Sequence, residues 1–259
     1  MSTTNSNDPF KKHIDGLWKK KQEYHQYVNM HLIHFMSIIP QRVLDIGCAG
    51  GKLGTVLKAK FPGLYVAGIE PDKAAAATAS YYLDKVITGT FESVDFKDHN
   101  LTPHFFDTVI LADVIEHMYN PWEIMILLKK WITPDAHIFL SIPNIQNLRI
   151  LLDVYQYGRW DYQTQGLLDF THIRFFTRQS IIQLLMDTGY QLSRIKPIID
   201  KEFQNLFDQS KHHKSINIEF EKITLKGLSP ENLEDLCAYQ FLIHATLRKK
   251  NETTCNLFD

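Results

Sequence analysis

The periodicity of apolar and polar residues changes at about residue 40. Before it, from Phe10 to Ile39, apolar side chains recur at helical spacing, which predicts one or two amphipathic helices that end at Pro40. After it, short runs rich in Val, Ile and Leu alternate with helical stretches. The runs predict buried strands at 42–46, 64–69, 85–88, 108–112 and 137–142, and the stretches between them predict helices at 52–60, 71–83 and 121–132. This alternation predicts a parallel sheet with helices on both faces.

The pattern becomes irregular after Pro143. Residues 144–177 carry many aromatic side chains without a regular period, and we expect an inserted lid there. A helix is predicted at 178–188 and strands at 190–199 and 239–248. The polar stretch between these strands is long for a connection, so a peripheral excursion is expected over about 200–237. Two strands without a clear helix between them predict an antiparallel strand added at one edge. The chain is thus expected to hold a helical cap at 1–39 and one α/β domain at 40–259.

Composition narrows the class of protein. A chain of 259 residues with 44% hydrophobic and 22% charged residues can bury one sizeable core. The formal net charge of −1 gives no general reason to bind nucleic acid or an anionic membrane. Three scattered cysteines, no secretory signal and no membrane-length apolar run predict a cytoplasmic protein. No metal site is expected, because the pair His212 and His213 has no acidic or cysteine partner at ligand spacing.

The strongest chemical signal is a glycine-rich turn after the first predicted strand. Residues 43–51 read Val-Leu-Asp-Ile-Gly-Cys-Ala-Gly-Gly and open a helix. Ala49 breaks the Gly-x-Gly-x-x-Gly fingerprint of dinucleotide sites, where a pyrophosphate must touch the loop. The turn instead suits a ligand with an ammonium, held by Asp45, and a carboxylate, held by backbone N–H groups. A tight strand-to-helix turn without a ligand is the other interpretation.

Further polar positions follow the next strands. Glu70 ends the second strand, where a carboxylate can accept both hydroxyls of a ribose, although an acid near a helix start is common without a ligand. Gly89, Thr90 and Phe91 follow the third strand, where an adenine would lie, and Phe91 could equally belong to the core. The fourth strand ends in Ala-Asp-Val-Ile-Glu-His, residues 112–117.

Together these segments resemble the class I S-adenosylmethionine-dependent methyltransferase superfamily, in the branch whose fourth motif reads Asp-Val-(Ile/Leu)-Glu-His. Residues 166–177 are similar to its Asp-x-Thr-His-x-Arg-Phe-Phe-Thr segment, and 239–245 to its last strand. The likeness covers about 40–190 and 239–247. It implies a Rossmann-like, seven-stranded sheet whose last strand is antiparallel, with S-adenosylmethionine as cofactor and S-adenosyl-L-homocysteine as product. The cofactor-binding residues expected are Asp45, Gly47, Cys48, Ala49, Gly51, Glu70, Pro71, Gly89, Thr90, Phe91, Ala112, Asp113, Val114 and His117.

Two histidines are candidates for a general base. His117 follows the fourth strand at the edge where ligands bind in open α/β sheets, and His172 lies in the aromatic segment. Each could instead hold a loop by a structural hydrogen bond, and Arg174 could pin the lid through a salt bridge. Tyr155, Trp160, Tyr162, His172 and Arg174 are the candidate substrate and lid residues. The aromatic ones among them could stack on an acceptor or pack the lid on the domain.

The function that this likeness implies is oxygen methylation of a sugar or a hydroxylated small molecule. An amine, a carboxylate or a protein stays open as acceptor, because fold does not determine substrate. The alternatives are a catalytically silent methyltransferase-fold partner and a nicotinamide-dependent oxidoreductase, against which Ala49 argues. A nucleic-acid substrate is not expected, since no Pro-Pro-aromatic turn follows the fourth strand. The segments 1–39 and 200–237 are candidates for a partner or homodimer interface.

Overall fold

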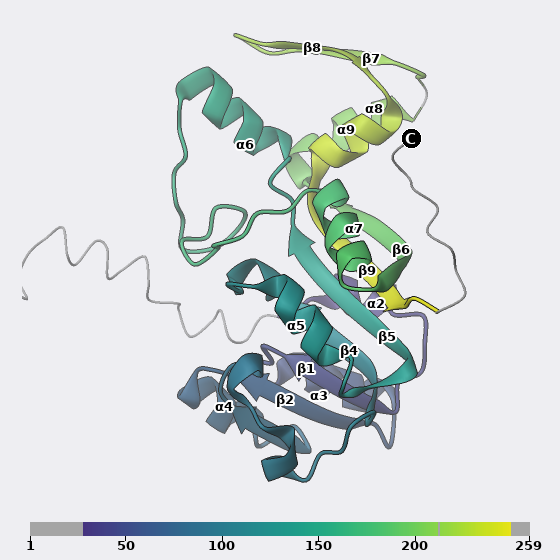
Figure 1. The fold of residues 1–259 in the computed structure, drawn as a ribbon. Coiled ribbons are helices and arrows are strands. Elements are labelled where there is room, and N and C mark those ends of the chain that lie inside the picture. Colours follow the sequence, from purple (N-terminus) through teal and green to yellow (C-terminus); the bar gives the residue numbers. More distant parts are fainter. Residues whose placement is uncertain (1–27, 212, 250–259) are drawn as a thin grey trace, which may run out of the picture.

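The computed structural model describes residues 28–211 and 213–249, and the expected helices at 10–39 lie largely outside them. Within the described ranges, seven strands form one sheet in the order β3-β2-β1-β4-β5-β9-β6 (Figure 1). These strands are β1 (Arg42–Ile46), β2 (Tyr65–Glu70), β3 (Lys85–Thr88), β4 (Phe106–Ala112), β5 (Ile132–Pro143), β6 (Tyr190–Ile199) and β9 (Ala238–Leu247). β1 to β5 pair in parallel, and β9 is antiparallel to its neighbours. The expected Rossmann-like sheet with an antiparallel last strand is confirmed.

The last strand lies inside the sheet. β9 pairs with β5 on one side and with β6 on the other, so the expectation of an antiparallel strand added at the edge is wrong and the edge belongs to β6. The side chains explain this order. β9 is buried along Phe241–Ile243 and needs neighbours on both sides, whereas β6 carries Arg194, Lys196 and Pro197, which suit an edge.

Helices cover both faces of the sheet (Figure 1). Buried residues of α5 and α7 join the larger core cluster with β4 and β5, while α2 and α3 pack on the opposite face against Val43 and Phe139. The helices are α2 (Met30–Phe35), α3 (Lys52–Lys60), α4 (Lys73–Ala79), α5 (Pro121–Leu128), α6 (Leu148–Leu152), α7 (Arg178–Asp187), α8 (Gln204–Ser210) and α9 (Pro230–Cys237). Among the described residues, none of the helices has the length and apolar character that a membrane crossing requires.

The observed element boundaries differ most from the predicted ones around β5. The helix expected at 121–132 ends at Leu128, and the following strand begins at Ile132 rather than at 137. Pro134 and Asp135 resemble a turn in the sequence and are exposed in the structure. They nevertheless continue the strand, because Ile132 pairs with Phe106 of β4 before a register shift. The periodicity of the sequence therefore does not reveal the first residues of β5, where the β4–β5 pairing is irregular.

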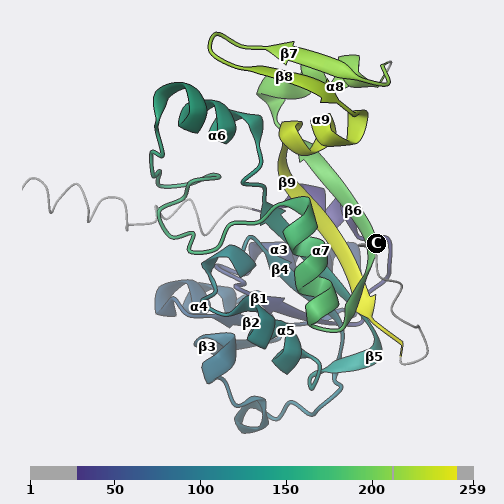
Figure 2. The ribbon, with the colours of Figure 1, turned by 45° about the horizontal axis from the view of Figure 1, so that its top comes forward.

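Residues 200–237 form a separate small layer beyond the ends of β6 and β9, as both ribbon views show (Figure 2). It contains α8, α9 and the hairpin of β7 (Ile216–Glu219) and β8 (Thr224–Leu228). Its buried residues form a cluster of their own with Leu148 of α6. The N–H of Asp200 donates to the carbonyl of Cys237 over 2.8 Å, which closes the two ends of the excursion on each other.

Candidate active site

A cavity of about 1300 Å³ opens where the carboxyl ends of β1, β2 and β4 meet residues 161–172 of the lid. Nearly all predicted cofactor residues line it, although they come from four separate segments of the chain. These lining residues are Asp45, Gly47, Cys48, Ala49, Glu70, Pro71, Gly89, Thr90, Phe91, Ala112, Asp113, Val114 and His117. The exception is Gly51, which the cavity lining does not include.

The loop after β1 turns through three left-handed residues, Gly47, Ala49 and Gly51, with φ of 72°, 47° and 77°. A Cβ on Gly47 would lie 2.6 Å from Val114 Cγ2, and one on Gly51 would lie 3.0 Å from Ala79 Cα. Packing between α3 and α4 therefore requires glycine at position 51. Ala49 adopts the conformation that glycine favours, so the side chain there does not change the course of the loop.

The amides of this loop are already engaged within the protein. Gly47 and Cys48 donate to the carbonyl of Ile69, and Ala49 donates to Oε2 of Glu70 over 2.8 Å. The loop itself therefore has few N–H groups to offer a carboxylate, in contrast to the sequence-based expectation. The first turn of α3 is better placed, because helix-start amides lack an intrahelical acceptor and Lys52 and Leu53 line the cavity.

Asp45 presents an unsatisfied acceptor at the base of this loop. Its side chain is 2% exposed, and Oδ2 has no hydrogen-bond partner among the described residues. Burial, reinforced by the charge of Glu70, raises the pKa of Asp45 to about 7. A buried carboxylate in this state gains most from a cation beside it. The site therefore fits a ligand that carries an ammonium group.

Glu70 is held in place by backbone amides. Its Oε2 accepts from Ala49 and its Oε1 accepts from Asp72 over 2.9 Å, so the carboxylate links the loop after β1 to the end of β2. A carboxylate oxygen has two lone pairs, and each can accept a further hydrogen bond from a hydroxyl. Glu70 lines the cavity, and its fixed position suits a pair of ribose hydroxyls.

The segment after β3 contributes both to the hydrophobic core and to the cavity wall. Phe91 is 5% exposed and packs edge-to-face on Phe96, with ring centroids 5.6 Å apart, so its ring is part of the core as well as of the cavity lining. Thr90 caps a short 3-10 turn, η2 (Phe91–Ser93), by a capping box with Ser93. The backbone of Gly89, tied to the carbonyl of Glu70 over 3.0 Å, shapes this wall.

Asp113 connects three elements at the end of β4. Its carboxylate accepts hydrogen bonds from Asn29, the N-cap of α2, and from Gln240 of β9. Burial raises its pKa, and the hydrogen bonds from Asn29, Ser141 and Gln240 oppose that rise. Asp113 itself has a φ of 56°, so the chain turns sharply here into the short 3-10 turn η4 (Ile115–His117).

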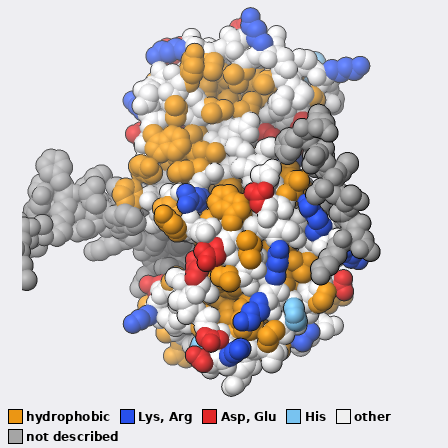
Figure 3. All heavy atoms as spheres, in the orientation of Figure 1, with side chains coloured by type: hydrophobic (Ala, Val, Ile, Leu, Met, Phe, Trp, Pro, Cys, Tyr) orange, Lys and Arg blue, Asp and Glu red, His pale blue; other side chains and the backbone are white. Residues whose placement is uncertain are grey.

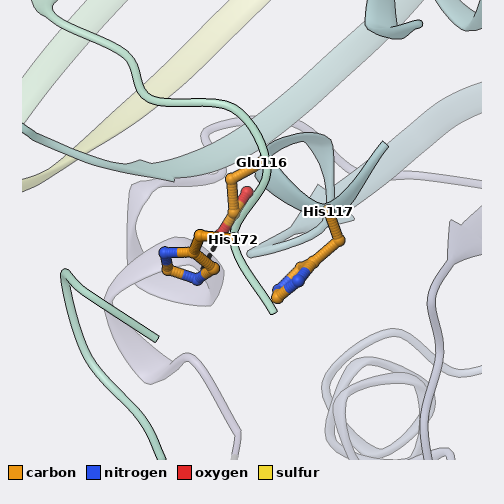
Figure 4. A group of neighbouring side chains, drawn as sticks. All are labelled: Glu116, His117 and His172. Atoms are coloured by element: carbon orange, nitrogen blue, oxygen red, sulfur yellow. Dashed lines mark ion pairs between the residues drawn. The ribbon is translucent and has the colours of Figure 1, made fainter. Parts of the chain in front are cut away.

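The lid brings the two candidate histidines together. The rings of His117 and His172 lie 4.8 Å apart in an edge-to-face arrangement, and Nε2 of His172 lies 3.9 Å from Oε1 of Glu116 (Figure 4). The backbone assembles this group, because the amides of Ile173 and Arg174 both donate to the carbonyl of Glu116 over 3.0 Å. All three side chains line the cavity.

The other predicted lid residues lie elsewhere. Tyr155 and Trp160 line a second, apolar hollow of about 480 Å³ together with Ile223 and Leu225 of the excursion. Apolar side chains gather over α6 and β7–β8 in this part of the surface (Figure 3). Tyr162 packs on the ring of Phe170 at 5.5 Å. A role of Tyr155, Trp160 and Tyr162 in binding the acceptor stays a prediction. None of the three lines the main cavity.

Arg174 pins the lid by a different contact from the expected salt bridge. Its Nε and Nη2 donate to the carbonyl of Tyr119 over 3.1 and 2.5 Å. Within the described ranges it makes no ion pair. The guanidinium therefore holds the segment after His172 against the segment after His117.

Sequence reasoning missed several residues of this site. In the sequence, Glu116 was only the neighbour of His117. The motif gave no sign that Glu116 would be buried, with 1% of its surface exposed. Asp169 and Thr171 also line the cavity, and the Thr171 hydroxyl donates to Asp169 over 2.7 Å. A polar Asp-x-Thr-His run within an aromatic segment was the available signal.

Comparison with known proteins decides the family. A model of the methyltransferase domain matches residues 21–194, more than half of the chain. This chain belongs to the methyltransferase-domain family. Among curated relatives, the ubiquinone biosynthesis O-methyltransferase of Rickettsia canadensis is 27% identical over 176 residues, which are 64% of this chain and 69% of the relative. That of Neisseria meningitidis is 28% identical over 148 residues, 52% of this chain and 60% of the relative.

Solved methyltransferases share the fold. A methyltransferase of Thermotoga maritima superposes with a TM-score of 0.56 at 13% identity, over 92% of this chain and 98% of that one. The plantazolicin methyltransferase, solved with S-adenosylhomocysteine, gives a TM-score of 0.53 at 14% identity, over 94% and 92%. The fold is that of the class I S-adenosylmethionine-dependent methyltransferase superfamily, as the motifs predicted.

Proposed function

We propose that this methyltransferase moves the methyl group of S-adenosylmethionine to a hydroxyl of a sugar or another small hydroxylated molecule. The observation that carries the proposal is the buried oxygen of Asp45 in the main cavity, which has no hydrogen-bond partner in the described part of the chain. An ammonium beside it would relieve the burial of that charge. Glu70, fixed by two amides, is the residue for the ribose hydroxyls.

The cavity has room for two molecules. Its volume of about 1300 Å³ exceeds the ~300–1,000 Å³ that a single small ligand usually occupies. One part, bordered by Asp45, Glu70 and Gly89, suits the cofactor, and the part bordered by His117 and His172 suits an acceptor. The sulfonium of the cofactor supplies an electrophilic methyl group. The task of the chain is then to aim the acceptor oxygen, which can supply ~7–11 kcal/mol of the barrier.

Oxygen is the acceptor atom that the relatives support, since those at 27% and 28% identity are named O-methyltransferases. A hydroxyl must lose its proton before or during transfer, and a positioned base contributes ~10²–10⁴-fold. His117 and His172 are the candidate bases by position. His172→Ala should leave cofactor affinity intact and lower turnover; normal turnover would return His172 to a purely structural role in the lid.

Calorimetric titration with S-adenosylhomocysteine tests the cofactor assignment, with NAD⁺ as the control ligand. We expect micromolar binding of the first and none of the second. Binding of neither would overturn the proposal and leave a silent partner subunit as the better interpretation. With binding in hand, methyl transfer from labelled S-adenosylmethionine to sugars and phenols tests the acceptor class, and exclusive labelling of amines would contradict it.

A further inference from the structure

Three side chains of the types that bind metal ions meet at one wall of the cavity. One ligand atom from each of Glu116, His117 and His172 lies within 4.8 Å of the other two (Figure 4). Two of them come from η4 at the end of β4, and the third comes from the lid. More than fifty positions of sequence separate the two histidines, so the lid must fold before the group exists.

Hydrogen bonds determine which nitrogen of each ring can bind a metal. Nδ1 of His117 lies 3.1 Å from the carbonyl oxygen of Thr171, and Nδ1 of His172 lies 3.2 Å from that of Leu167. A carbonyl oxygen only accepts, so each Nδ1 carries the hydrogen and donates it. In the neutral rings Nε2 therefore keeps its lone pair. Anchoring the distal N–H to a carbonyl is the usual arrangement around metal-binding histidines, because it sets both tautomer and orientation.

The carboxylate of Glu116 completes the set. Its side chain is 2% exposed, and Oε1 faces Nε2 of His172 at 3.9 Å, beyond hydrogen-bond distance. A cation between the carboxylate and the imidazole nitrogen would be attracted to both. A proton on His172 would give an ion pair, whereas a metal ion would bind both groups and His117 as well.

We propose that Glu116, His117 and His172 form a site for a divalent transition-metal ion of the zinc type, with an open position toward the cavity. Two imidazoles and one carboxylate are a donor set typical of catalytic zinc, which keeps a fourth position for water or substrate. Bonds of ~2.0–2.1 Å to nitrogen and oxygen place tetrahedral ligands ~3.4 Å apart. The three ligand atoms lie within 4.8 Å of one another, so they would have to draw closer when the ion binds.

This site rests on the proposed function and deepens it, because the open position would take the acceptor hydroxyl. Zinc lowers the pKa of a bound water to ~7, and an alcohol or phenol is acidified in the same way. The hydroxyl proton passes to a water molecule of the cavity. The acceptor oxygen would then form its bond to the methyl carbon as the carbon–sulfur bond breaks, and the bonding pair would stay on sulfur as S-adenosylhomocysteine. With a metal bound, both histidines would serve as ligands, and a water molecule would take the proton in place of a histidine base.

Metal binding to the full chain tests the site without any measurement of turnover. After removal of metals with a chelator, the chain is titrated with Zn²⁺ by calorimetry and with Co²⁺ by visible absorption. We expect stoichiometric binding with the absorption of a low-symmetry Co²⁺ site. Glu116→Gln and His172→Gln should each weaken Zn²⁺ affinity by at least tenfold, while His99→Gln, which removes a histidine outside the cavity, should leave it unchanged.

Binding of S-adenosylhomocysteine to the same variants separates the two proposals. We expect unchanged cofactor affinity in Glu116→Gln and His172→Gln, which also shows that they fold. Cofactor binding without Zn²⁺ binding would overturn the metal site alone and leave an ion pair between Glu116 and His172. Equal Zn²⁺ affinity in all variants would overturn it too. Zn²⁺ binding that depends on Glu116 and His172, in a chain that does not bind the cofactor, would instead contradict the proposed function.

Discussion

At the scale of single residues, the charge of Asp45 should determine how tightly the cofactor binds. Asp45→Asn removes the charge that we expect to pair with the ammonium of the cofactor, and a lost charged hydrogen bond of ~1.5–3 kcal/mol weakens binding by about 10–100-fold. With a pKa of about 7 in the free protein, the carboxylate must ionise before it binds a cation. Wild-type affinity for S-adenosylhomocysteine should therefore be about tenfold weaker at pH 6 than at pH 8. Calorimetry at both pH values checks this, and a variant with the same pH dependence as the wild type would contradict it.

The same carboxyl group makes stability depend on pH in the unliganded protein. Its pKa is raised in the folded state from an ordinary value of 3.8 to about 7, so the folded state holds the proton more tightly. The stabilisation is complete below about pH 4 and is lost as pH rises through 7. Wild type should lose stability relative to Asp45→Asn between pH 5 and pH 8. Thermal unfolding of both proteins at the two pH values measures the difference, which should narrow when cofactor is added.

Residue identity could be predicted where the chemistry is local. Asp45 and Glu70 could be proposed from the sequence because each carboxylate follows a predicted strand near a glycine turn, and the structure places both in the cavity lining. Glu116 was not, because its burial depends on a lid segment that folds over it from a distant part of the chain. The expectation that the loop amides bind a carboxylate failed for a related reason. The acceptors of these amides belong to β2, which is a separate segment of the chain.

At the scale of elements, Arg178 joins α7 to α9. At the first position of α7, it donates from Nη2 to Glu234 over 2.6 Å and from Nε to Asp235 over 2.5 Å. Its side chain is 13% exposed, so water screens the pairs only partly. Arg178→Ala should lower the free energy of unfolding by about 1–3 kcal/mol and speed hydrogen exchange in α9.

A matched control for that variant is Lys58→Ala, which removes a pair with Asp84 at half-exposed positions. Exposed pairs contribute ~0–1 kcal/mol, so chemical denaturation should show a small change. Equal effects of the two substitutions would mean that the contacts between α7 and α9 do not stabilise the excursion.

Most elements were predictable from periodicity because each has its own apolar face. The bounds of β1, β3 and α3 agree with the sequence pattern residue for residue. The hairpin β7–β8 was not predicted, since exposed polar residues alternate with only a few apolar ones there. The insertion of β9 between β5 and β6 was equally hidden, because strand order depends on pairings between segments far apart in the chain.

At the scale of the whole molecule, cofactor binding should stabilise the fold, since the cavity joins residues from β1, β2, β4 and the lid. A ligand present at a hundred times its dissociation constant adds ~2.7 kcal/mol to the stability of the folded state. For a chain of this size that corresponds to a rise of about 5–10 °C in Tm. Thermal unfolding with S-adenosylhomocysteine measures it, and the Asp45→Asn variant at the same ligand concentration should show a smaller rise.

The closure of Asp200 on Cys237 has a consequence for how such a protein could change over generations. Ile199 pairs with Ala238, so the whole excursion is in topological terms the loop of a hairpin formed by β6 and β9. Lengthening a loop costs little entropy, and its loss would leave every strand beside its present neighbours. A single genetic insertion or deletion at this point could exchange one wall of the apolar hollow while the cofactor half stays intact. Residues 200–237 are thus a natural segment for a laboratory exchange that reshapes the apolar hollow.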